Sequence, residues 1–167
     1  MMNDSVIGPI GDIGPMLTAW RALPFSVAGL LESTDPRPHL QSWGVLLSGD
    51  AATTDVALGF YGKAAEDGRK GDVIDFLEIP LAEHFRSQGF GVGSLFSHVN
   101  VSSVDRNPAI FGWRELLDAG LVFVKREALA LPAAITWTRT SDIVDAVSAR
   151  EPDAPALIAD ALAQIGR

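Results

Sequence analysis

A glycine-rich stretch in the middle of the chain most constrains the possible folds. Residues 86–93 read RSQGFGVG, with three glycines spaced two residues apart. A strand-like run, VIDFLEIP at 73–80, precedes the stretch, and an apolar run that ends near His98 follows it with helical spacing. Glycine permits backbone conformations in which successive N–H groups point at one ligand. The order of strand, glycine loop and helix therefore predicts an anion site at a helix start.

Two well-known phosphate loops do not fit this stretch. The dinucleotide fingerprint requires a first strand that opens a βαβ unit and an acidic residue on the next strand. The Walker loop requires Gly-Lys-Ser or Gly-Lys-Thr, which the chain lacks. A turn that binds nothing remains an alternative interpretation of the same glycines.

Charge and composition exclude several classes of function. The net charge of −8 argues against nucleic acid as the main partner, because phosphate binding requires a basic face. The chain has no cysteine, so disulfides and thiolate chemistry are excluded, and no spacing of His, Asp and Glu predicts a metal site. The first residues lack the features of a signal peptide, and no apolar run is long enough to span a membrane. We therefore expect a cytoplasmic protein without a membrane partner.

The first half of the chain predicts helices followed by a meander of strands. VIGPI at 6–10 is typical of a short strand, and the apolar spacing over 16–31, interrupted by Pro24, predicts a broken helix. SWGVLLSGD at 42–50 and DVALGFYGKA at 55–64 predict a hairpin. Together with VIDFLEIP, these runs predict three antiparallel strands over 43–80.

The second half predicts a helix, a strand pair and terminal helices. Residues 106–121 predict a helix that Asn107 caps at its start and Gly120 at its end. LVFVKRE at 121–127 and PAAITWTRT at 132–140 predict two paired strands. Residues 141–167 predict a helical extension, with Ser141 as its N-cap and a break near two prolines. The expected fold is a single α/β (α+β) domain over 1–167, with a mixed, mostly antiparallel sheet flanked by helices.

Two segments resemble the GNAT superfamily of N-acyltransferases. RSQGFG at 86–91 resembles that family's Arg/Gln-x-x-Gly-x-Gly/Ala loop, and DRNPAIFGWRELLDAGLVFVKRE at 105–127 is similar to its Asn-x-x-Ala…Gly-Phe stretch. The resemblance spans roughly residues 43–127. It implies a GNAT-like fold, acetyl-CoA (or another acyl-coenzyme A) as co-substrate, and transfer of the acyl group to an amine without a metal.

The resemblance also implies which residues bind the cofactor. Coenzyme A would contact Ile79, Arg86, Gln88, Gly89, Phe90, Gly91, Val92, Gly93 and Asn107. The loop could also hold another phosphate ligand. Two departures stand out: Leu116 occupies the position of the family's usual Tyr acid, and the link to a fifth strand at 99–103 is short.

Glu78 and His84 are the candidate catalytic residues. Glu78 lies near the end of the predicted third strand, where a carboxylate could accept a proton from an amine directly or through water. Asp75, on the opposite face, is the weaker candidate, and His84 precedes the loop. The structural alternatives are a half-exposed strand acid and a solvated loop histidine.

The expected acceptor is a small-molecule amine or a protein amine, which the acidic balance of the chain favours. The region from Pro132 could extend the sheet or pair with a second copy in a homodimer. The alternative function is a non-catalytic GNAT-like module that binds a nucleotide-like ligand or a protein partner. The missing Tyr acid and the short link favour this alternative.

Overall fold

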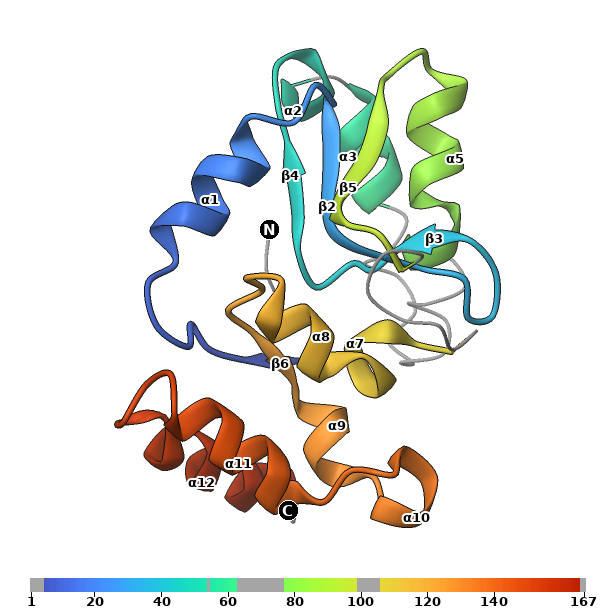
Figure 1. The fold of residues 1–167 in the computed structure, drawn as a ribbon. Coiled ribbons are helices and arrows are strands. Elements are labelled where there is room, and N and C mark those ends of the chain that lie inside the picture. Colours follow the sequence, from blue (N-terminus) through green and yellow to red (C-terminus); the bar gives the residue numbers. More distant parts are fainter. Residues whose placement is uncertain (1–4, 54, 63–76, 99–105, 166–167) are drawn as a thin grey trace. The chain divides into compact units, whose positions relative to one another are not determined.

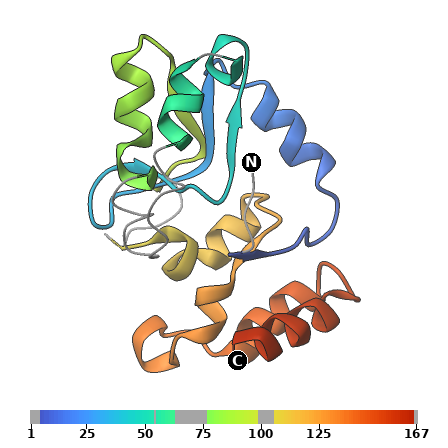
Figure 2. The ribbon, with the colours of Figure 1, turned by 180° about the vertical axis from the view of Figure 1, so that it is seen from behind.

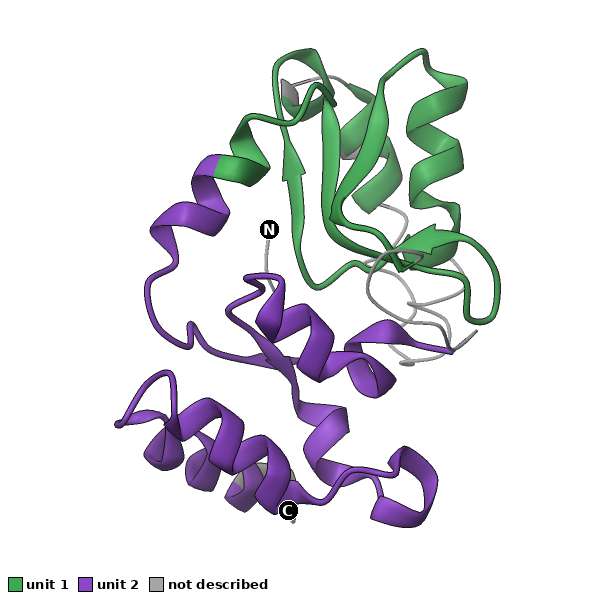
Figure 3. Ribbon diagram, in the orientation of Figure 1, with its two compact units in different colours: residues 1–3, 19–100 green, residues 4–18, 101–167 purple. Residues whose placement is uncertain are grey.

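The computed structural model describes residues 5–53, 55–62, 77–98 and 106–165, and it shows a mixed α/β protein (Figure 1). Contacts divide the chain into two compact units, and the single domain over 1–167 stays a prediction. Unit 1 contains residues 1–3 and 19–100, and unit 2 contains residues 4–18 and 101–167 (Figure 3). The predicted α+β class is confirmed, and antiparallel pairings outnumber parallel ones among the described strands.

Strand β2 (Val27–Ser33) is the centre of the sheet in unit 1. It pairs antiparallel with β3 (His39–Leu40) and β4 (Val45–Leu47), and parallel with β5 (Val92–Phe96). The same three residues of β2 pair with both β4 and β5, so these two strands flank it on opposite edges. All but one residue of β2 is buried, which explains why its sequence VAGLLES is a nearly continuous apolar run.

Two helices pack over the sheet of unit 1. Figures 1 and 2 show α3 (Asp55–Gly62) beside α5 (Ile79–Ser87). The rings of Phe60 and Phe85 lie 6.0 Å apart between these helices, and both belong to one apolar cluster with Val27 and Val92 of the sheet. The short helix α2 (Asp50–Thr53) precedes α3.

Helix α1 (Gly14–Arg21) is the first half of the helical region predicted over 16–31. The indole Nε1 of Trp20 donates a hydrogen bond to the carbonyl of Ala28, at 2.9 Å. The second half of the prediction is wrong, because residues 27–33 form β2. A short run of buried apolar residues is compatible with either a helix or a central strand. Here the segment is a strand because β4 and β5 pair with its two edges.

Three further strand predictions are wrong. DVALGFYG forms α3, in which Ala57 and Phe60 are buried at helical spacing. Ile79 and Pro80 begin α5, and the earlier part of the strand predicted at 73–80, including Asp75, lies outside the described residues. PAAITWTRT forms the one-turn helix α10 (Ala133–Thr136). Among the described residues, β4 is the one strand of the meander predicted over 43–80, and its partner β2 precedes that region in the chain.

The helix predicted after the glycine loop is also wrong. Residues 92–96 form β5, and α5 ends before the loop. The order is therefore helix, glycine loop and strand, the reverse of the prediction. The fifth strand considered at 99–103 lies outside the described residues.

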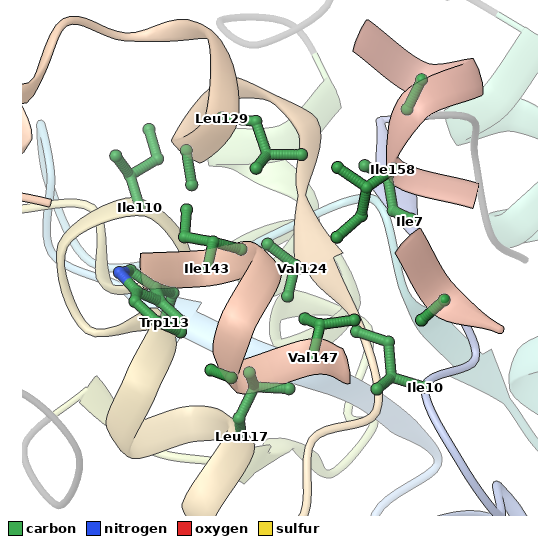
Figure 4. Close-up of a cluster of buried hydrophobic side chains, with 14 residues drawn as sticks. Ile7, Ile10, Ile110, Trp113, Leu117, Val124, Leu129, Ile143, Val147 and Ile158 are labelled. Carbon is green, nitrogen blue, oxygen red and sulfur yellow. The ribbon is translucent and has the colours of Figure 1, made fainter. Parts of the chain in front are cut away.

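Unit 2 contains a two-stranded sheet and most of the helices. Strand β1 (Val6–Ile7) pairs antiparallel with β6 (Val124–Lys125), which confirms two predicted strands. The helices are α7 (Pro108–Phe111), α8 (Trp113–Asp118), α9 (Arg126–Ala130), α10, α11 (Thr140–Ser148) and α12 (Ala154–Ile165). Figure 4 shows their shared core, in which Ile143 and Val147 of α11 meet Trp113 and Val124. The predicted terminal helices thus supply part of this core.

The single helix predicted over 106–121 is wrong, because the chain breaks at Gly112 into α7 and α8, but the two predicted caps are confirmed. Oδ1 of Asn107 accepts a hydrogen bond from the N–H of Ala109 at 3.1 Å. Gly120 has φ +100°, and the N–H of Leu121 donates to the carbonyl of Leu116, as in a Schellman cap. Ser141 is not the N-cap of α11: that position is Arg139, whose N–H donates to Oδ2 of Asp142 at 2.9 Å.

Candidate functional site

The candidate site lies where the parallel strands β2 and β5 end. Leu31 and Phe96 are the last residues that these two strands pair with each other. Glu32 and Ser33 follow on one strand, and polar residues at 97–98 follow on the other. Carboxyl ends of parallel strands meet at one edge of a sheet, and in open α/β sheets this edge is where ligands bind. The topology of unit 1 therefore gathers polar side chains that are far apart in sequence.

A pocket of about 60 Å³ occupies this edge. Its lining comes from β2, β3, α5 and the residues after β5: Glu32, Ser33, Pro38, His39, Leu40, Ala82, Arg86 and His98. All of these residues belong to unit 1. The volume corresponds to roughly four to six water-sized spheres, so the pocket suits a small polar molecule or one end of a larger one.

One face of α5 forms a wall of the pocket. Glu78 at the helix start, Ala82 and Arg86 are spaced four residues apart and so lie on the same side of the helix. Ala82 and Arg86 line the pocket directly. The side chain of Ala82 is small, so space remains on this face of α5 between Glu78 and Arg86. Both Glu78 and Arg86 were predicted site residues, and the helix brings them to one face.

His39 and Glu78 form a histidine–carboxylate pair in which His39 is buried and Glu78 is partly buried. His39 is 7% exposed, and its Nδ1 lies 2.7 Å from the carbonyl oxygen of Arg37. A carbonyl only accepts, so Nδ1 carries the proton and Nε2 of the neutral ring has a free lone pair. Nε2 lies 3.7 Å from Oε1 of Glu78. The same Oε1 accepts a hydrogen bond from the N–H of Ser42 at 3.1 Å, which holds the carboxylate in place.

A second histidine–carboxylate pair stands at the other side of the pocket. Nδ1 of His98 lies 3.4 Å from Oε1 of Glu32. The hydroxyl of Ser97 donates to the same oxygen. Nδ1 of His98 is buried and makes no hydrogen bond to the described residues. A buried polar atom without a hydrogen bond is costly in a fold, and the nearby carboxylate of Glu32 can accept from this nitrogen when the nitrogen carries a proton.

Arg86 supplies the permanent positive charge of the pocket. Its side chain is exposed, and none of the ion pairs among the described residues involves it. A guanidinium group presents a planar fork of donors that matches a carboxylate or phosphate. Anion binding by Arg86 therefore stays a prediction. The place where Arg86 could bind an anion is this pocket, not the glycine loop.

The glycine loop itself is explained by the end of α5. Gly89 has φ +86°, and its N–H donates to the carbonyl of Arg86 at 2.9 Å. The N–H of Phe90 donates to the carbonyl of Phe85 at 3.1 Å, and their rings lie 6.0 Å apart. These contacts make a Schellman cap with its usual apolar contact. The N–H groups of Gln88, Gly89 and Phe90 are occupied by helix carbonyls, and a helix end carries partial negative charge. These N–H groups are therefore not free to bind a pyrophosphate, and no helix begins here.

The remaining predicted cofactor residues have structural contacts. Val92 and Gly93 pair with β2, and a Cβ on Gly93 would lie 2.2 Å from the ring of Phe25. The carbonyl of Gly91 accepts from the N–H of Val27. Ile79 is buried, and Asn107 caps a helix in unit 2.

His84 faces away from the pocket wall. Its ring lies 4.7 Å from that of Phe60, and its Nε2 lies 3.3 Å from the carbonyl of Val56. Tyr61 neighbours the same Phe60 edge-on, and burial raises the pKa of its phenol. His84 is thus packed between α3 and α5, and it does not line the pocket with Arg86.

Sequence reasoning missed most of the pocket. Glu32, Ser33, His39 and His98 were not among the predicted site residues. The available signal was the polar pair that follows each buried strand, ES after VAGLL and SH after VGSLF. Among the described residues, no group of three or more His, Asp or Glu side chains could hold a metal ion.

Comparisons with protein families, with characterised proteins and with solved structures found no match to the chain. Within the described ranges, no helix has both the length and the apolar character required to cross a membrane.

Proposed function

We propose that unit 1 binds a small polar molecule in this pocket and exchanges a proton with it through His39. The observation that carries the proposal is the fixed orientation of the His39 ring. Its Nδ1 is held by the Arg37 carbonyl, and its Nε2 stands 3.7 Å from Glu78. In the neutral ring Nε2 can accept a proton from a ligand, and the carboxylate of Glu78 then stabilises the imidazolium.

The state of the His39 ring is directly measurable. Nitrogen-15 spectra of the imidazole rings should show the neutral His39 ring protonated on Nδ1. A neutral ring protonated on Nε2 would remove the lone pair on which the proposal depends.

Binding is tested with the same histidines. The chain has three, so their ring resonances form a small and readable set. A panel of acetate, methylammonium, glycine and inorganic phosphate should move the signals of His39 and His98. The His84 signal should stay in place, because that ring packs on Phe60. If no member of the panel at tens of millimolar moves either pocket histidine, the proposal is wrong.

An acyl-coenzyme A-dependent N-acyltransferase with a GNAT-like fold is the second candidate function. One observation favours it: Glu78, the base expected from the sequence, lies beside His39 at the pocket. The amine acceptor would occupy the pocket and lose its proton to this pair. The neutral amine would then attack the thioester carbonyl, the C–S bond would break, and the leaving coenzyme A thiolate would take a proton from solvent. Coenzyme A would have to bind through side chains such as Arg86, because the N–H groups of Gln88–Phe90 cap α5.

Release of free thiol from acetyl-coenzyme A tests this second function. With a panel of amines we expect turnover that Glu78→Gln lowers by about 10²-fold or more, as for loss of a general base. Gly91→Val tests the glycine loop separately from Glu78. A Cβ at residue 91 would lie 3.8 Å from its nearest neighbours, so the fold should tolerate the substitution. Thiol release no faster than the blank with every amine would reject acyl transfer. Ligand binding without turnover would instead match the non-catalytic module.

A further inference from the structure

We propose that the pocket of unit 1 binds a small zwitterion of the α-amino acid class, with its ammonium group against Glu32 and its carboxylate against Arg86. The inference rests on the proposed function, because it names the ligand of the same pocket.

The two charged side chains reach the pocket from different elements. Glu32 lies at the end of β2 and Arg86 in the last turn of α5, and both line the pocket. They do not form an ion pair within 4.0 Å. Two opposite charges that share a pocket without neutralising each other match a ligand that carries both charges. A ligand with one charge would leave the other side chain uncompensated.

Glu32 keeps an oxygen for the ligand. Its described side-chain contacts, from the Ser97 hydroxyl and to His98 Nδ1, both use Oε1. An ionised carboxylate accepts on both oxygens, so Oε2 is available to an ammonium group. The Ser97 bond fixes the orientation of the carboxylate before the ligand arrives.

The ligand's carboxylate matches Arg86. The guanidinium fork can make two parallel hydrogen bonds to one carboxylate, which gives direction as well as attraction. Ala82, one turn earlier on the same face of α5, leaves the room that a larger side chain would fill.

The size of the pocket and the position of His39 agree with this ligand class. About 60 Å³ suits a compact head group such as that of glycine. His39 lines the same pocket, so a bound ligand should be visible in its ring signals.

Titrations of the parent protein and three variants test the inference. Glycine, acetate and methylammonium are added while the ring signals of His39 and His98 are followed, with His84 as the internal reference. Glu32→Gln should weaken the binding of glycine by about tenfold or more and leave that of acetate within about twofold, because the amide keeps the volume of the side chain but lacks the charge that attracts an ammonium group. Arg86→Gln should weaken the binding of both glycine and acetate by about tenfold or more. Arg21→Gln removes an exposed positive charge on α1 and is the matched control, which should bind like the parent.

The outcomes separate this inference from the function on which it rests. Tighter binding of glycine than of either single-charge ligand, lost in both pocket variants, supports the zwitterion. If acetate binds as tightly as glycine and Glu32→Gln does not change its affinity, the zwitterion proposal is overturned, but the proposal of a small-molecule site stands. The same conclusion follows if methylammonium binds as tightly as glycine and Arg86→Gln does not change its affinity. No response of His39 or His98 to any of the three ligands would overturn the zwitterion, and no response to inorganic phosphate either would overturn the small-molecule site as well.

Discussion

At the scale of single residues, Trp137 has the most unusual conformation in the described chain. Its φ is +56°, the left-handed region that bulky L-residues avoid, and its N–H donates to the carbonyl of Ala133 at 2.7 Å. The side chain is 73% exposed, so burial does not compensate the strain. Hydrogen bonds between Thr136 and Thr138 fix the backbone on both sides of it.

We predict that Trp137→Gly is more stable than Trp137→Ala by about 1 kcal/mol. Both variants lose the indole ring, but only glycine removes the left-handed strain, which costs roughly 1–2 kcal/mol for an L-residue. Part of that gain is offset by the greater backbone freedom of glycine in the unfolded chain. Urea titrations of the two variants measure the difference. Equal midpoints would show that the backbone here is not strained.

At the scale of elements, the end of α5 decides how the glycine loop is used. Gly89 supplies the left-handed residue of the cap, whereas Gly91 does not have positive φ and a Cβ there would meet nothing closer than 3.8 Å. The two glycines therefore differ in their structural roles, although they look equivalent in the sequence.

We expect Gly89→Ala to destabilise the fold by about 1 kcal/mol, because alanine pays for the left-handed conformation that glycine adopts freely. Gly91→Ala is the matched control and should change stability by less than about 0.5 kcal/mol. Denaturant titrations followed by circular dichroism compare the two. If Gly91→Ala were the more damaging variant, the loop would depend on backbone approach and not on the cap.

At the scale of the whole molecule, each compact unit has its own apolar core. Ile143 is fully buried in the core of unit 2, among Trp113, Val124 and Val147 (Figure 4). Leu157 on α12 belongs to the same unit and is 46% exposed. The pair allows a buried and an exposed truncation to be compared within one core.

Ile143→Ala should lower the free energy of unfolding by about 2–5 kcal/mol, through lost apolar contact and the cavity left behind. Leu157→Ala, the control, should cost much less because its side chain already meets solvent. Denaturant titrations followed by circular dichroism measure the loss for each variant. Similar losses for the two variants would mean that α11 does not pack as described.

The sequence by itself determined the features that depend on neighbouring residues. The cap at Asn107, the cap at Gly120 and the two terminal helices were all predicted, because their signals lie within one or two helical turns. The first strand and the strand at β6 were also predicted from short apolar runs beside turn residues. The chain's net charge and lack of cysteine required no structure.

Only the tertiary structure decided what depends on distant partners. VAGLLES became a strand because β4 and β5 pair with it, and DVALGFYG became a helix because Phe60 packs on Phe85. The glycine loop changed its meaning once α5 was found before it and β5 after it. The pocket draws on residues from Glu32 to His98, and no local pattern brings them together. The parallel pairing of β2 with β5 does so, because such pairing is fixed by contacts far apart along the chain.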